Sequence, residues 1–281
     1  MRFLGMITFI TALILPVFAQ AEIIHDKVYE SVMQTKTLRC GYADYAPWIM
    51  TDPNTKQVTG IMREVMDEIG KRMGVKVEWT ASMGWGEITT AANSGKIDLF
   101  CNTVWTDKAQ LRNMSLSRPL YYTPTYAYVR VDDVRFDHDY MAINDPKITI
   151  AGIDGDSSYI VMQDSFPKAT MLALPNTATP SEQILSVLTK KADVFLADPS
   201  IFQEYNKSNP GKIRQVKGAP LFVMNEVLVT RAGEQQLMNV INTVLYSLIN
   251  EGVIARIIHK YGVTTSLAPR PDVDLPLLTG K

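Results

Sequence analysis

The segment from Gly95 to Tyr122, GKIDLFCNTVWTDKAQLRNMSLSRPLYY, gives the clearest indication of the fold of this 281-residue chain. It begins with a short apolar run at 97–101 that is typical of a buried strand. A polar turn and a short helical pattern follow. A Ser-Arg-Pro break at 117–119 then leads into aromatic residues that predict another strand. The segment therefore predicts a strand–helix–strand unit.

The same alternation of apolar runs and helical patterns continues on both sides of this segment, in two series. In the first series we predict strands at 37–42, 75–79 and 97–101 and helices at 60–73 and 85–93. In the second we predict strands at 148–151, 170–174 and 194–197 and helices at 157–164 and 180–190. Such alternation predicts βαβ units with parallel sheets, in two lobes separated near residues 132–133.

Two extended, β-rich stretches, 124–131 and 222–230, are candidates for paired hinge strands between the lobes. A long helix is predicted at 234–250 and a second one from Gly252 to Tyr261.

The 95–122 segment resembles the ligand-gripping segment of family 3 periplasmic solute-binding proteins, the amino-acid receptors of ABC importers. In that family the segment runs roughly G-K-I-D-L-I-I-S-G-M-T-I-T-P-E-R and then F-S-x-P-Y. With Asp98 on the family's Asp, Ser117 and Pro119 fall on the family's Ser and Pro without a gap. The resemblance implies a type II periplasmic binding protein fold, with two α/β lobes joined by two hinge strands. Lobe 1 would comprise residues 22–130 and 223–262, lobe 2 residues 131–222, and 263–281 would be a surface tail.

The start of the chain predicts export. Residues 1–21 contain Arg2, an apolar run and an Ala19-Gln20-Ala21 ending, which together are typical of a cleavable secretory signal peptide. A membrane anchor is the alternative, although Pro16 interrupts the run. The chain is 46% apolar and has 28 basic against 29 acidic residues, so its charge does not favour nucleic acid. We expect a monomeric periplasmic protein.

The two cysteines, Cys40 and Cys101, both lie in apolar, strand-like runs. In the resembled family these strands are neighbours in the first lobe, and an oxidising compartment permits a disulfide. Two separately buried thiols are the alternative. The sequence has no C-x-x-C motif and no Cys/His cluster, so we expect neither a metal nor a cofactor.

Three residues of the second lobe are candidate ligand contacts. Ser157 and Ser158 open a helix after a strand, where free backbone N–H groups attract anions. The resembled family binds the ligand's carboxylate at this turn. Asp198 follows the strand at 194–197, and in the family this Asp accepts the ligand's α-ammonium group. For all three residues, helix capping is the alternative role.

The remaining candidate contacts belong to the first lobe. Tyr45 and Trp48 flank Pro47 in a loop that resembles an aromatic pattern at the family's cleft mouth. We also expect contacts from Trp85 and from the residues that follow the third strand, Asn102, Thr103 and Trp105, with Trp105 in the turn. The aromatic rings can stack on a flat group or surround a cation, or they can belong to the core.

One position departs from the family pattern. The alignment puts Gln110 where the family carries the Arg that clamps the ligand's α-carboxylate, and an amide cannot replace a bidentate guanidinium. Lys108 and Arg112 are each displaced by two positions, and Arg118 lies in the break. We therefore expect a divergent member whose ligand is not a standard α-amino acid.

The resemblance implies a receptor that captures a small polar solute, an amino acid or a related amine, and hands it to an ABC permease by hinge closure. Two alternatives stay open. One is a periplasmic cyclohexadienyl dehydratase on the same fold, with Glu226 in the second hinge as a possible acid. The other is a ligand sensor for a membrane signalling partner. No Ser/His/Asp spacing or G-x-S-x-G turn is present, and we expect no enzymatic activity.

Overall fold

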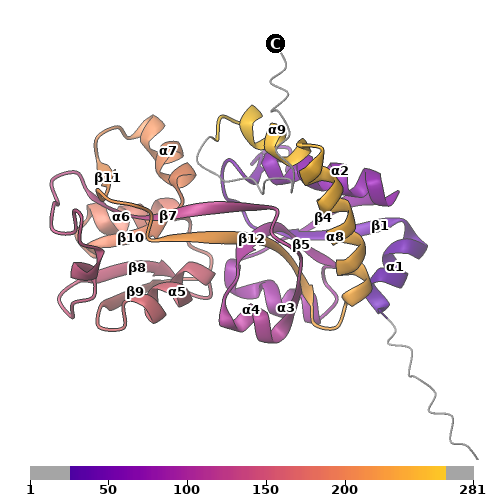
Figure 1. Ribbon diagram of the computed structural model, residues 1–281, viewed down its shortest axis with the longest axis horizontal. Coiled ribbons are helices and arrows are strands. Elements are labelled where there is room, and N and C mark those ends of the chain that lie inside the picture. Colours follow the sequence, from indigo (N-terminus) through magenta and orange to yellow (C-terminus); the bar gives the residue numbers. More distant parts are fainter. Residues whose placement is uncertain (1–25, 264–281) are drawn as a thin grey trace, which may run out of the picture.

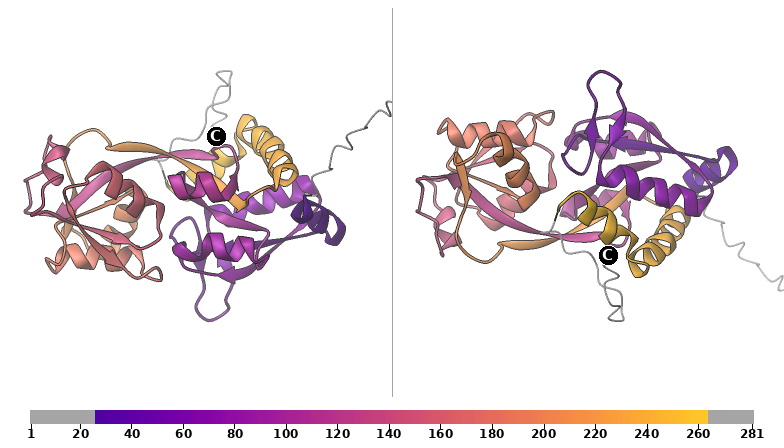
Figure 2. Two further views of the ribbon diagram at one scale, coloured as in Figure 1. Left: turned by 90° about the horizontal axis from the view of Figure 1, so that it is seen from below. Right: turned by 90° about the horizontal axis from the view of Figure 1, so that it is seen from above.

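The computed structural model describes residues 26–263. The predicted signal peptide at 1–21 and nearly all of the predicted tail at 263–281 lie outside this range. The described residues form two α/β lobes that lie end to end, and two long strands run between them (Figure 1). The views in Figure 2 show both strands along one side of the molecule. These strands are β7 (Tyr121–Arg130) and β12 (Phe222–Arg231).

The first lobe is built from the start and the end of the described chain, and its helices cover a largely parallel sheet. Strand β1 pairs in parallel with β4 and with β5. The elements are α1 (Lys27–Thr35), β1 (Thr37–Tyr42), β2 (Met50–Thr51), β3 (Val58–Thr59), α2 (Ile61–Met73), β4 (Lys76–Ser82), the 3-10 helix η1 (Trp85–Glu87), α3 (Ile88–Asn93), β5 (Leu99–Trp105), α4 (Lys108–Asn113), β6 (Met114–Leu116), α8 (Gln235–Asn250) and α9 (Val253–Lys260).

The second lobe is continuous in sequence. Strand β8 pairs in parallel with both β9 and β10, and β10 pairs with the hinge strand β7. Its elements are the 3-10 helix η2 (Tyr140–Ile143), β8 (Thr149–Ile153), α5 (Ser157–Ser165), β9 (Thr170–Leu174), α6 (Pro180–Leu188), β10 (Val194–Ala197), α7 (Pro199–Ser208) and β11 (Ile213–Gln215).

The hinge strands join the two sheets into one path, β4-β1-β5-β12-β7-β10-β8-β9. Strand β12 lies between β5 and β7 and is antiparallel to both. In this register Glu226 is opposite Trp105, the last residue of β5, and opposite Tyr121, the first residue of β7. The centre of β12 is therefore brought to the point where the third strand of lobe 1 ends. Two strands joining two parallel-sheet lobes are the arrangement that the sequence predicts.

Helix α2 illustrates how the sequence pattern produces the core. Its apolar residues Ile61, Val65, Ile69 and Met73 recur on one face and are all buried against the sheet of lobe 1. The helix ends at Gly74, whose φ of +69° is in the left-handed region that glycine adopts without strain. The predicted helix at 60–73 is thus found within one residue.

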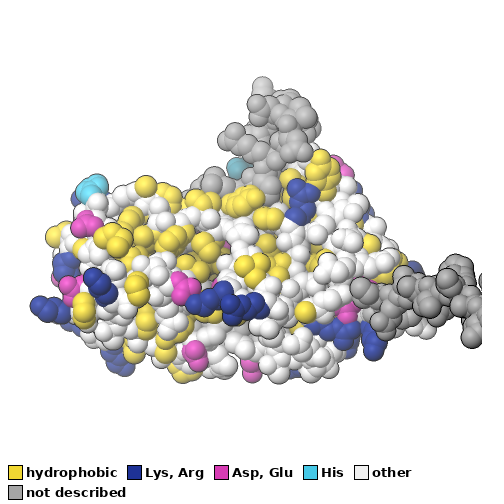
Figure 3. Space-filling view, turned by 60° about the horizontal axis from the view of Figure 1, so that its bottom comes forward, with side chains coloured by type: hydrophobic (Ala, Val, Ile, Leu, Met, Phe, Trp, Pro, Cys, Tyr) yellow, Lys and Arg dark blue, Asp and Glu magenta, His cyan; other side chains and the backbone are white. Residues whose placement is uncertain are grey.

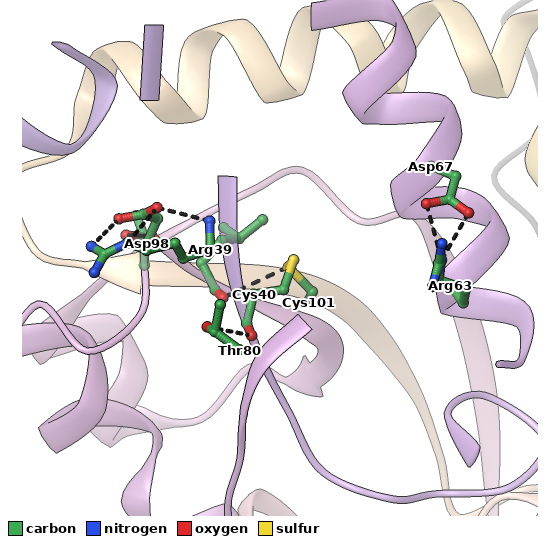
Figure 4. Close-up of a disulfide and its surroundings, with 9 residues drawn as sticks. Arg39, Cys40, Arg63, Asp67, Thr80, Asp98 and Cys101 are labelled. Atoms are coloured by element: carbon green, nitrogen blue, oxygen red, sulfur yellow. Dashed lines mark hydrogen bonds and ion pairs between the residues drawn. A yellow bond between two sulfur atoms is a disulfide. The ribbon is translucent and has the colours of Figure 1, made fainter. Parts of the chain in front are cut away.

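The disulfide and Asp98 hold the first and third strands of lobe 1 together (Figure 4). Cys40 in β1 and Cys101 in β5 are bonded, with 5.3 Å between their Cα atoms. Asp98 immediately precedes β5 and is only 2% exposed. Its carboxylate accepts hydrogen bonds from the backbone N–H of Arg39 (2.8 Å) and from the Arg39 guanidinium (2.6 Å). The Asp on which the family alignment rests therefore links β5 to β1.

The predicted end of the third strand of lobe 1 is wrong. The apolar pattern predicts that the third strand ends at Cys101, with Trp105 in the turn beyond it, but β5 runs from Leu99 to Trp105. The strand continues because β12 pairs alongside it, as Val227 opposite Val104 and Glu226 opposite Trp105. The residues around β5 do not indicate this pairing, because β12 lies more than 100 residues further along the chain.

The surface of the molecule carries charged side chains of both signs. Lys and Arg side chains and Asp and Glu side chains are both scattered over the face shown in Figure 3, in line with a net charge of −1.

Within residues 26–263 no single helix is long and apolar enough to cross a membrane. Helices α8 and α9 meet that test only as a pair bent by 70°, and their buried apolar residues pack in the core of lobe 1.

Candidate functional site

A cavity of about 60 Å³ lies between the lobes beside the hinge strands. All of the sequence-predicted ligand residues except Gln110 line it. Those from lobe 1 are Tyr45, Trp48, Trp85, Asn102, Thr103 and Trp105, and those from lobe 2 are Ser157, Ser158 and Asp198. The cavity also has lining residues that the sequence predictions left out of the ligand set, among them Tyr121, Asp156, Gln183 and Glu226.

Asp198 is placed by the start of α7. Its side chain accepts a hydrogen bond from the backbone N–H of Ser200 (2.7 Å), so it is the N-cap of the helix, and Pro199 occupies the first helical position. The other carboxylate oxygen accepts a hydrogen bond from the hydroxyl of Tyr45 at 2.7 Å. Because Tyr45 belongs to lobe 1, Asp198 both caps a helix and joins the lobes at the cavity.

Trp48 makes a second connection across the cleft. Its indole N–H donates to the hydroxyl of Ser200 at 3.1 Å, and its ring stacks on Tyr121 with 4.4 Å between centroids and 3° between planes. Tyr45 meets Trp85 edge to face, with 5.6 Å between centroids. Together with Trp105, these aromatic side chains form much of the cavity wall. Ring faces of this kind attract positive charge.

Glu226 is a buried carboxyl group in the lining, and its pKa is raised. It comes from the hinge strand β12 and is 6% exposed. Its Oε1 accepts hydrogen bonds from the indole N–H of Trp105 (2.9 Å) and from the hydroxyl of Thr123 (2.7 Å). Burial raises the pKa of the Glu226 carboxyl to about 7, because the charged form loses its hydration, and the hydrogen bonds to it oppose this rise.

A third carboxyl group, that of Asp156, completes an acidic lining. It caps α5 by accepting a hydrogen bond from the backbone N–H of Ser158 at 2.7 Å, and burial raises its pKa. Among the described residues, no Lys, Arg or His lines the cavity. The cavity therefore combines three carboxyl groups and several aromatic rings without a basic side chain.

Gln110 lies beside the cavity and is engaged by its neighbours. Its side-chain oxygen accepts a hydrogen bond from the backbone N–H of Asp107 (3.1 Å), and its amide donates to the hydroxyl of Ser157 (2.7 Å). The nearby basic residues also have other partners. Lys108 pairs with Asp164 at the exposed rim, and Arg118 lies over the ring of Tyr246. Within the described part of the chain, no cationic group thus replaces the family's Arg at this cavity.

A wider groove of about 470 Å³ adjoins the cavity. Tyr45, Pro180 and Ile201 line both spaces, and the groove continues along the loop before β2 and along α6 and α7. The Tyr45 side chain therefore stands between the inner cavity and a more open space on the cleft surface.

The sequence is similar to bacterial solute-binding proteins and to a bacterial sensor protein. The model of the bacterial extracellular solute-binding proteins, family 3, matches residues 38–264. The probable ABC transporter extracellular-binding protein YckB of Bacillus subtilis is 29% identical over 148 residues, which cover 53% of this chain and 50% of YckB. The virulence sensor protein BvgS of Bordetella pertussis is 26% identical over 208 residues, which cover 73% of this chain and 16% of BvgS. The chain thus spans no more than half the length of these relatives.

The fold is shared with solved structures. The crystal structure of AncCDT-1, an ancestral amino acid-binding protein and precursor of cyclohexadienyl dehydratase, superposes with a TM-score of 0.71 at 23% identity. The superposition covers 83% of this chain and 97% of that chain. The fold is therefore that of the type II periplasmic binding proteins. Because the family model also covers most of the chain, the protein belongs to family 3 of the bacterial extracellular solute-binding proteins.

Proposed function

We propose that the protein captures a small amine-bearing solute between its lobes in the periplasm and presents it to an ABC permease. The observation that carries this proposal is the cavity between the lobes, where Asp198 and aromatic side chains meet beside two hinge strands. Small-molecule sites of this kind are concave, largely apolar and equipped with a few polar groups. The lining of this cavity fits that description.

Closure of the lobes is the proposed mechanism. The contacts Tyr45–Asp198, Trp48–Ser200 and Gln110–Ser157 all cross from one lobe to the other. The loops also approach closely, since a Cβ atom on Gly155 would lie 2.6 Å from the Cα of Gly86. We infer that this arrangement is the closed form, and that opening about β7 and β12 breaks these few contacts to admit the solute.

Two measurements test this proposal together. A thermal-shift screen over amino acids, amines, sugars and organic acids identifies a ligand, since a ligand at about 100 times its Kd adds about 2.7 kcal/mol to the free energy of unfolding. Solution scattering then measures the radius of gyration with and without that ligand. We expect the radius to decrease. A ligand that binds tightly and leaves the scattering curve unchanged would contradict capture by closure.

A sensor is the second candidate, and the similarity to BvgS over 73% of this chain favours it. Both candidates require solute binding, so binding alone does not separate them. The separating experiment reconstitutes the protein with its candidate permease in vesicles and measures ATP hydrolysis. Ligand-dependent stimulation of the ATPase supports import, and a permease that stays unresponsive while the protein binds its ligand supports sensing.

We propose no bond chemistry at this site. A dehydratase acting on a cyclohexadienyl acid needs a clamp for the substrate's carboxylates as well as a proton donor. Glu226 has the pKa of a possible donor, but the described lining contains no basic side chain to hold a carboxylate. We expect no turnover of prephenate or arogenate, monitored by product absorbance at high protein concentration. Measurable turnover that is lost in Glu226→Gln would make the protein an enzyme.

A further inference from the structure

Glu226 is a carboxyl group held in a fixed position at the cavity. Trp105 on β5 and Thr123 on β7 donate hydrogen bonds to it from the strands on either side. Both bonds end on the same oxygen, Oε1. The group is therefore oriented by its neighbours before any ligand arrives, as expected of a side chain that recognises charge.

This placement is costly for a residue with a purely structural role. A buried carboxylate is normally paired with a cation, because burying an isolated charge is unfavourable. Within residues 26–263 no ion pair includes Glu226, and the lining residues around it add Asp198 and Asp156 with no basic side chain. When Glu226 is ionised, no basic side chain of the described lining offsets its negative charge, and a cation that enters the cavity can pair with it.

We propose that Glu226 is a ligand-binding residue which, together with Asp198 and the aromatic rings, makes the cleft selective for small organic cations that lack a carboxylate group. This inference rests on the proposed capture of a solute and adds the class of ligand. The ammonium or guanidinium group of a simple amine meets the carboxylates and ring faces, and no basic residue of the described lining is present to attract a carboxylate.

The titratable groups that face Glu226 predict how binding depends on pH. They are Asp198 from lobe 2, Tyr45 from the first loop and Tyr121 on β7. Burial and the negative charge of Asp198 favour the protonated carboxyl, while both tyrosines stay neutral because burial raises their pKa values further; a bound cation favours the ionised carboxyl. Binding should therefore release a proton near neutral pH. From the pKa of about 7 we expect affinity to rise about tenfold between pH 6 and pH 8.

The decisive experiment compares ligands that differ only in the carboxylate. Agmatine is titrated against arginine, cadaverine against lysine, and putrescine against ornithine, by calorimetry at pH 8. We expect each amine to bind at least tenfold tighter than its amino acid. If the amino acids bind equally well or better, the inference is wrong although solute capture stands. If none of these cations binds, the inference is also wrong, and a neutral or acidic ligand from the thermal-shift screen would leave solute capture intact.

A variant pair isolates the role of Glu226. Glu226→Gln removes the charge and keeps the size, and we expect it to weaken the best amine at least tenfold at pH 8 and to abolish the pH dependence. Glu234→Gln is the matched control, because Glu234 is also buried but lies outside the cavity. Equal losses in both variants, or unchanged binding in Glu226→Gln, would overturn the proposal. Should Glu226→Gln fail to fold, the comparison of each amine with its amino acid on the wild-type protein decides the question, and amino acids that bind as tightly as the amines would overturn the proposal.

Discussion

Replacing Asp198 separates its two roles, as helix cap and as proposed cation partner. In Asp198→Asn the charge is lost, but an Asn is about as good an N-cap as an Asp, so the start of α7 should be preserved. In Asp198→Ala both the charge and the hydrogen bond from the backbone N–H of Ser200 are lost. The difference between the two variants therefore reports the cap together with the hydrogen bond from Tyr45, and their shared effect isolates the charge.

The expected magnitudes follow from these contacts. Loss of the cap costs about 0.5–2 kcal/mol of folding free energy, to which Asp198→Ala adds the loss of the hydrogen bond from Tyr45. Removing one partner of a buried charge pair costs about 2–5 kcal/mol of binding free energy. That range corresponds to a loss of affinity between about 30-fold and several thousand-fold. We expect both variants to show the binding loss and only Asp198→Ala to be clearly destabilised.

The assay measures binding and folding on the same samples. Calorimetry with the amine that gives the largest thermal shift reports the Kd, and urea unfolding followed by circular dichroism reports the free energy of unfolding. Tyr45→Phe is the control, since it removes the hydroxyl that donates to Asp198 and leaves the carboxylate in place. The reasoning is refuted if Asp198→Asn binds the amine with unchanged affinity, because Asp198 would then be a helix cap and nothing more.

Three further predictions concern the rest of the molecule. Replacing both Cys40 and Cys101 with Ala should lower the free energy of unfolding by up to about 4 kcal/mol, from the chain entropy of a crosslink that spans 61 residues, as measured by urea unfolding. Glu226 has a folded pKa of about 7 against an ordinary value of 4.5, so its stabilising contribution is complete below pH 4.5 and is lost as the pH rises through 7. The unfolding free energy should therefore fall by at most about 3 kcal/mol over that window, and thermal melts of Glu226→Gln should lack this fall. Gln110→Arg should not improve binding of the amine and should create weak binding of common amino acids near Ser157; calorimetry with one panel on both proteins checks this, and tighter amine binding would count against the cationic ligand.

The strands and helices were largely predictable because burial leaves a periodic trace in the sequence. Strands β1, β9 and β10 have the predicted boundaries, and α2 begins one residue later than predicted. Buried residues recur about every two positions in a strand and every 3.6 positions in a helix, and these short-range patterns can be recognised in one sequence. The extension of β5 to Trp105 was not predictable in this way, since it depends on pairing with β12.

A candidate site residue was predictable where it stands at the end of a predicted strand. Asp198 follows a buried strand, at the end where open α/β sheets hold their ligands, and this position together with the family resemblance indicated it. Glu226 is indicated by the sequence only as a possible acid in a hinge strand. Its place in the cavity depends on the register of β12 against both β5 and β7, which brings it opposite Trp105 and Tyr121. No local pattern contains that register.

The most direct test of the account is a crystal structure of the protein with its tightest amine ligand. We predict that the amine lies between the lobes and that its positively charged nitrogen is within hydrogen-bonding distance, about 3 Å, of the carboxylates of Asp198 and Glu226. A ligand bound outside this cavity, or one whose charged group meets neither carboxylate, would contradict the account.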